Sequence, residues 1–174
     1  VLYLFIYGKI FALETVGNGK KRSLFCMTYD IIMNLPASWT CEQDTYLDES
    51  GYEITHLEAH LRNDRKQQDD AGIDIYVGNI PEGETAEDQA LANYAETVGF
   101  YDDDPEDFNP IDKFKFNGKN AYGFSALCED DSPMRFIAQE VRKGVLAIIV
   151  FVAKDEKALA DTYRLIECNF RVKD

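Results

Sequence analysis

Two histidines, His56 and His60, come closest in this sequence to a spacing that could do chemistry. If residues 52–61 form a strand, Glu58 projects from the same face as both, because side chains alternate along a strand. Two imidazoles and a carboxylate suit a divalent transition metal. The exposed polar face of a half-buried strand has the same pattern. The sequence leaves both interpretations open, so these three residues are weak metal-ligand candidates.

Acidic residues form a second group. Asp102, Asp104 and Glu106 alternate like the first ligands of a calcium-binding loop, but Asp107 replaces the required glycine and Lys113 replaces the required glutamate. The calcium-loop pattern therefore fails at both diagnostic positions. We expect this segment to serve instead as a docking surface for a basic protein partner, formed by Asp102, Asp103, Asp104, Glu106 and Asp107.

Signals for covalent catalysis are absent from the sequence. There is no Gly-x-Ser-x-Gly elbow and no phosphate-binding Gly-x-x-x-x-Gly-Lys loop. Any Cys–His pair would have to use one of the same two histidines. We therefore predict a protein that is not an enzyme and carries no cofactor. The alternative is a metal-binding or hydrolytic enzyme centred on His56, Glu58 and His60.

The element that carries the histidines can be interpreted in two ways. As a strand, residues 52–61 place Leu57, Ala59 and Leu61 on one apolar face, whereas as a helix they would form a stripe that includes Ile54. We predict a strand, because residues 63–72 look like a charged hairpin loop that leads into a second strand over residues 73–77.

The next element is a predicted helix over residues 85–99. Thr85 can cap it, Asp88 occupies the capping-box position, and Gly99 suits its C-terminal end. The spacing of its apolar residues predicts a buried stripe formed by Leu91, Tyr94 and Val98.

The remaining elements are predicted to be mostly strands. Residues 1–14 and 23–35 read as strands, the second of which ends at Pro36. An Asn117-Gly118 turn joins two strands of a meander that continues through residues 134–141 and 145–152. The last of these is apolar throughout and is predicted to be a central strand, followed by a helix that Asp155 caps. The predicted core residues are Trp39, Tyr122, Phe124, Ile148, Val150, Tyr163, Ile166 and Phe170.

Composition limits the class of partner. The chain has 174 residues and a net charge of −14. Residues 82–112 contain eleven acids and no Lys or Arg, and the other residues carry 21 acids against 18 bases. This balance argues against nucleic acids and anionic membranes as partners. No apolar run is long enough for a transmembrane span. The four cysteines show no zinc spacing, and we expect Cys128 and Cys168 to be buried thiols.

Two groups of residues resemble the PsbP/DcrB-like superfamily. The first is the segment of residues 29–39, which contains Leu35-Pro36 and Trp39, followed by residues 73–77 ahead of the helix at Thr85. The second is the run of residues 117–124, with the strand and helix of residues 147–170. The resemblance covers residues 23–174 and implies an α+β fold, in which helices sandwich a mostly antiparallel sheet. It also implies binding or accessory roles with no shared active site, in proteins that include lipoproteins and Eag-type chaperones.

Together these observations predict one domain over residues 1–174, with residues 1–22 as an extension outside the resemblance. The predicted function is a non-enzymatic bacterial interaction or accessory protein that binds another protein and can form a homodimer. A small-solute-binding module is a further alternative. No signal peptide or lipid-acceptor cysteine is visible, which favours the cytoplasm over the periplasm.

Overall fold

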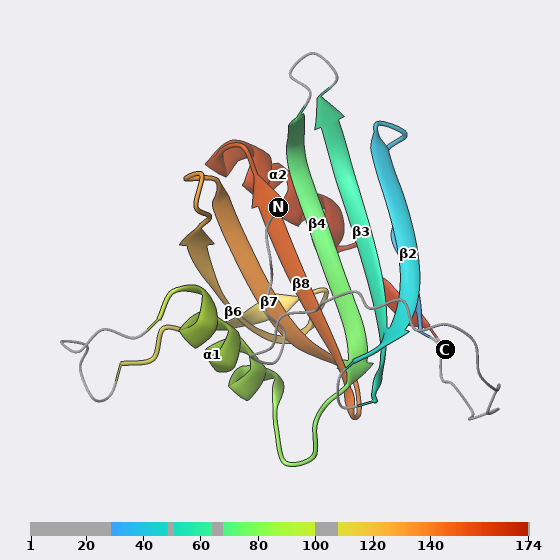
Figure 1. Cartoon of the computed structure of the whole chain (residues 1–174), viewed down its shortest axis with the longest axis vertical. Coiled ribbons are helices and arrows are strands. Elements are labelled where there is room, and N and C mark those ends of the chain that lie inside the picture. The colour runs from blue at the N-terminus through green and yellow to red at the C-terminus, as the bar shows by residue number, and fades with distance from the viewer. Residues whose placement is uncertain (1–28, 49–50, 64–67, 100–107, 174) are drawn as a thin grey trace, which may run out of the picture.

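The computed structural model describes residues 29–48, 51–63, 68–99 and 108–173. Seven strands form one antiparallel sheet in the order β2-β3-β4-β8-β7-β6-β5 (Figure 1). Their bounds are β2 Trp39–Leu47, β3 Glu53–Asn63, β4 Gln68–Asn79, β5 Asp112–Phe116, β6 Lys119–Leu127, β7 Pro133–Arg142 and β8 Val145–Ala153. A separate two-stranded sheet pairs β1 (Asp30–Ile32) with β9 (Arg171–Lys173).

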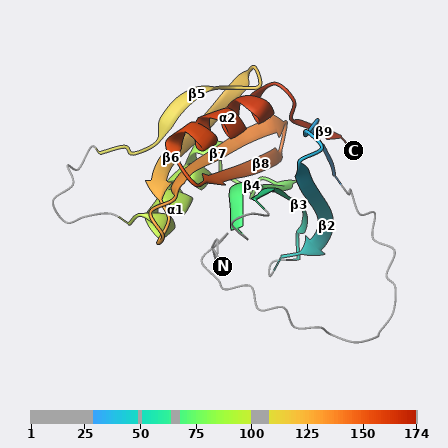
Figure 2. The ribbon, with the colours of Figure 1, turned by 90° about the horizontal axis from the view of Figure 1, so that it is seen from above.

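The expectation of an α+β sandwich is wrong, because the protein is mostly β. Strands hold 54% of the described residues and helices hold 18%. The described helices are α1 (Ala86–Thr97) and α2 (Glu156–Glu167), which are too few to form the layers of a sandwich. Helix α1 contacts β6 and β7, and α2 contacts β4, β7 and β8 on the other face (Figure 2). The sequence analysis also missed β2, whose largely exposed residues have no apolar period.

The apolar strand β8 occupies the middle of the sheet, which confirms its predicted central position. Its odd-numbered residues, including Ile149 and Phe151, are buried in the core that lies against α2. Its even-numbered residues, including Ile148 and Val150, are buried in a second core against α1. A strand covered on both faces has no exposed side of its own, which explains why β8 shows no polar alternation.

Helix α1 begins as predicted but is turned about its axis relative to the expected stripe. Thr85 and Asp88 form a complete capping box. The buried residues of the helix are Ala86, Gln89, Ala90 and Asn93. Leu91 is 39% exposed, so its predicted burial is wrong. Small residues let the helix lie close to the sheet, where Tyr94 meets Phe124 edge-on at a ring distance of 5.3 Å.

The C-terminal elements follow the prediction closely. The Asp155 carboxylate accepts a hydrogen bond from the Ala158 N–H and caps α2. The turn residues Asn117 and Gly118 have positive φ angles of 48° and 76°, as a type I′ turn requires. Of the predicted core residues, Phe124, Ile148, Val150, Ile166 and Phe170 are buried, whereas Trp39, Tyr122 and Tyr163 are half-buried.

The N-terminal elements differ more. Within the predicted strand 23–35, the structure describes only the short strand β1, and residues 1–28 lie outside the described part. Trp39 begins β2 and is half-buried, packed against the core on the α2 side. Cys128 is half-buried and Cys168 is exposed, so the expectation of a buried thiol is wrong for Cys168. Neither of the described helices is long and apolar enough to cross a membrane.

The central position of β8 predicts a large loss of unfolding free energy when one of its buried side chains is truncated. Replacing Ile148 with alanine should cost about 2–5 kcal/mol of unfolding free energy, because a cavity remains between the sheet and α1. Leu127→Ala is the control, since Leu127 is 63% exposed, and should change the free energy by about 0.5 kcal/mol or less. Urea unfolding followed by circular dichroism measures both. Similar losses for the two variants would contradict this packing.

Candidate functional site

Strands β2, β3 and β4 present a face of charged residues, which we call the acidic sheet face. The opposite face of the same strands is apolar, with Leu57, Ala59, Ile73 and Ile75 buried. Because side chains alternate, the residues between them point to the other side. The acidic sheet face consists of Glu42, Asp44, His56, Glu58, His60, Asp69 and Asp74.

Register places acids directly opposite one another on this face. Glu42 on β2 is paired with Glu58 on β3, and Glu58 is in turn paired with Asp74 on β4. Three carboxylates thus form one row across three neighbouring strands. Like charges in directly opposed positions destabilise a sheet, so this row is unfavourable unless cations lie near it.

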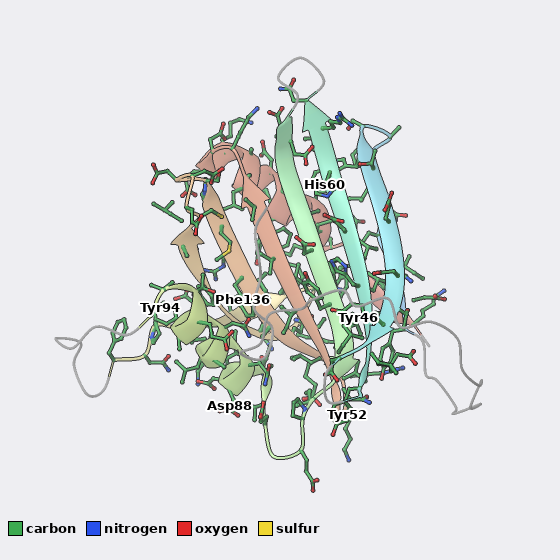
Figure 3. All side chains as sticks on the ribbon, in the orientation of Figure 1. Tyr46, Tyr52, His60, Asp88, Tyr94 and Phe136 are labelled. Carbon is green, nitrogen blue, oxygen red and sulfur yellow. The ribbon has the colours of Figure 1, made fainter. Side chains whose placement is uncertain are left out.

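Helix α1 lies on the same side of the sheet as the acidic face but covers a different part of it. Tyr76 of β4 packs at the border of the core beneath α1, and β3 and β2 lie beyond that border. Figure 3 labels His60 on β3, well away from Tyr94 on α1. Within the described residues, neither helix covers the acidic face.

His56 is held between two carboxylates. Its Nε2 atom lies 3.0 Å from Oδ1 of Asp74, and its Nδ1 atom lies 3.5 Å from Oδ1 of Asp44. Its ring stacks on Tyr76 at a centroid distance of 4.4 Å. Burial lowers the pKa of His56, but the hydrogen bond with Asp74 and the charges of Asp74, Asp44 and Glu58 outweigh burial and raise the pKa above 6.5.

His60 has a similar arrangement with different partners. Its Nε2 atom lies 2.8 Å from Oε1 of Glu58, and its Nδ1 atom lies 3.0 Å from Oδ2 of Asp69. A protonated imidazole can donate to two acceptors at once, one through each ring nitrogen. Each histidine can therefore offset part of the negative charge around it, and each uses both nitrogens to do so.

Two tyrosines near these carboxylates have raised pKa values. Burial, followed by the charges of Asp44 and Asp48, raises the pKa of Tyr46 to about 12. Burial also raises the pKa of Tyr76, with a further contribution from the charge of Asp74. Burial and the nearby carboxylates both disfavour the negatively charged phenolate form. Both phenols therefore stay protonated and neutral at physiological pH.

The predicted metal-ligand candidates share a face but do not form one ligand set. His56 and His60 are four residues apart, about 13 Å along a strand, and each ring bonds to its own carboxylates. Among the described residues, no group of three or more His, Cys, Asp or Glu side chains is arranged to hold a metal ion. The strand interpretation of this segment is confirmed.

The predicted docking residues in the acidic loop, Asp102, Asp103, Asp104, Glu106 and Asp107, lie outside the described residues, so that docking surface stays a prediction. The sequence analysis missed the other acidic residues of the sheet face. Asp74 alternates with apolar residues in β4 and could have been assigned to it. Asp44 could not, because β2 had not been recognised as a strand.

A hollow of about 370 Å³ lies on the opposite side of the sheet, beside α2. Apolar side chains form part of its lining, namely Trp39, Leu61, Ala71, Ala158 and Leu165. Two ion pairs lie among its polar lining residues, Lys154 with Asp70 at 3.1 Å and Lys157 with Asp161 at 2.6 Å. An apolar body with a polar end suits such a lining.

No family model, curated protein or solved structure matches this chain. The resemblance to the PsbP/DcrB-like superfamily therefore stays a prediction.

The raised pKa of His56 predicts a pH-dependent stability. The folded state holds the proton more tightly than the unfolded state, so this stabilisation is fully present below about pH 6.5 and is lost as pH rises through the folded pKa. The wild type should therefore exceed His56→Gln in unfolding free energy most at pH 6, and the difference should shrink by pH 9. Urea titrations across that range measure it. A difference that does not change with pH would contradict the arrangement around Asp74.

Proposed function

We propose that this chain is a non-enzymatic interaction protein that binds a basic protein partner through the acidic sheet face. The observation that carries the proposal is the row of Glu42, Glu58 and Asp74, which lie opposite one another across three strands. Lys or Arg side chains of a partner would relieve this repulsion on binding.

The charge balance of the strands supports a cationic partner. Strands β2 and β4 contain no Lys or Arg, and β3 contains one base, Arg62. Asp44 and Asp69 add two further carboxylates beside the row; His56 lies near Asp44, His60 lies near Asp69, and Arg62 is paired with Asp69 in the register of β3 and β4. Exposed carboxylates also attract a basic partner from a distance and speed its association at low ionic strength.

An apolar, chaperone-like groove has less support. In the described parts of the chain, the large apolar residues that are exposed belong to separate elements: Leu47, Tyr52, Leu91, Phe108 and Leu127. Leu47 and Tyr52 flank one hairpin, and the others lie on α1, before β5 and at the end of β6. This scatter does not form the continuous surface that a hydrophobic helix requires.

The proposal is tested with a labelled lysine-rich peptide and two charge variants. The variant Glu42→Gln, Asp44→Asn, Glu58→Gln should bind about tenfold more weakly than the wild type, because three exposed ion pairs together contribute about 1.4 kcal/mol. Fluorescence anisotropy at low and physiological salt measures the affinity.

The matched control removes three exposed carboxylates elsewhere, by Glu82→Gln, Glu96→Gln, Glu129→Gln. It has the same net charge as the first variant, so it should keep the wild-type affinity within about twofold if the face itself binds. Equal weakening by the two variants would show that binding follows net charge, and would overturn the proposal.

A second candidate function is small-solute binding in the hollow beside α2, because its apolar and ion-paired lining is open to a ligand of modest size. Trp39 is the single tryptophan of the chain and lines this hollow, so its emission reports occupancy.

The solute candidate is tested with 1-anilinonaphthalene-8-sulfonate, whose ring system suits the apolar lining and whose sulfonate suits the lysines. Binding should reduce Trp39 emission by energy transfer. Ala158→Leu fills part of the hollow and should weaken binding about fivefold or more, roughly 1 kcal/mol. Equal emission changes in the variant and the wild type would place the dye elsewhere and remove this candidate function.

A further inference from the structure

Among the residues that the structure describes, β2 pairs along one edge only. It is the last strand in the sheet order, and it contributes nine residues that pair only with β3. An edge strand directs the backbone N–H and C=O groups of every second residue outward, where they can pair with another chain. The opposite edge, β5, has five residues and carries Lys113 and Lys115.

Strand β2 lacks several features that usually protect an edge. Its register with β3 runs without a shift from Trp39 opposite Leu61 to Leu47 opposite Glu53, so no bulge bends it away. It contains no proline and no lysine. Residues 40–45 are exposed on both faces. Strand β1 contacts β2 through a side chain, because the Ile31 N–H of β1 donates a hydrogen bond to the Gln43 side chain of β2. The backbone of β1 pairs with β9 and not with β2.

A second copy of this chain fits the edge poorly. Antiparallel pairing of two β2 strands about Gln43 would set Glu42 of one opposite Asp44 of the other. Like charges directly opposed destabilise a strand pair. The net charge of −14 on each copy adds to this repulsion.

A basic extended peptide fits both the edge and its charge. On the acidic side, β2 presents Glu42 and Asp44, and on the other side it presents the uncharged residues Cys41, Gln43 and Thr45. A strand added beside β2 would therefore be complementary with Lys or Arg at every second position and uncharged residues between them. Its long basic side chains could also lean toward Glu58 on β3.

We propose that the partner docks by adding a strand to the edge of β2, as an extended segment with basic residues at alternate positions. This inference rests on the proposed function of the acidic sheet face and adds its mode of binding. Backbone hydrogen bonds then supply part of the affinity, and the alternating charges set which face the segment presents.

The test uses the full chain and a nine-residue peptide of alternating Lys and Thr, acetylated and amidated at its ends. Two further peptides carry N-methyl groups, one on every Lys nitrogen and the other on every Thr nitrogen. In a strand, alternate N–H groups point to opposite edges, so only one of these peptides loses its bonds to β2.

We expect one methylated peptide to bind about tenfold more weakly than the unmodified peptide and the other to stay within about twofold. Equal affinities for the two methylated peptides, whether retained or lost, would overturn strand addition. In that case the acidic sheet face would still be supported as the binding surface if the unmodified peptide binds more weakly to the variant Glu42→Gln, Asp44→Asn, Glu58→Gln than to the wild type. Failure of the unmodified peptide to bind would overturn the proposed function as well.

Discussion

The rest of the fold depends on the burial of β8 on both faces. Nearly every side chain of this strand is apolar, so each side of the sheet must be covered where β8 runs. Helix α2 covers one side and α1 covers the other, and each is only twelve residues long. Because both helices cover the same central region, neither of these two described helices covers β2 and β3 on the side of the acidic residues. The location of the exposed face thus follows from the location of the core.

The exposed face is polar for a related reason. On β3 and β4, most residues that point to the α2 side are buried and apolar, whereas Glu58 and the other charged residues point the other way. Exposure alone permits any polar residue, but it does not require acids in opposed positions. The carboxylate row is therefore distinguished by its register, which sets Glu42, Glu58 and Asp74 opposite one another on neighbouring strands. The two histidines offset part of this repulsion, and a basic partner would offset more.

The edge of β2 and its two carboxylates together would select which strand can pair there. An unpaired edge by itself invites aggregation, which natural sheets oppose with charge, proline or bulges. Here Glu42 and Asp44 oppose pairing between identical chains, while the same carboxylates favour a basic strand. One set of side chains can therefore serve both to exclude the wrong neighbour and to attract the right one.

The sequence alone determined the elements whose signals are local. The Thr85 capping box, the Asn117-Gly118 turn, the Asp155 cap and the apolar run of β8 were all predictable, because each depends on a few adjacent residues. The shared face of His56, Glu58 and His60 was also predictable from strand alternation. Only the tertiary structure determined that Asp44 and Asp69 join these residues, because strand register brings them from two other strands, β2 and β4. It also revealed β2, whose largely exposed residues carry no periodic apolar signal. Finally, it showed that the fold is mostly β, with two helices and no α+β sandwich.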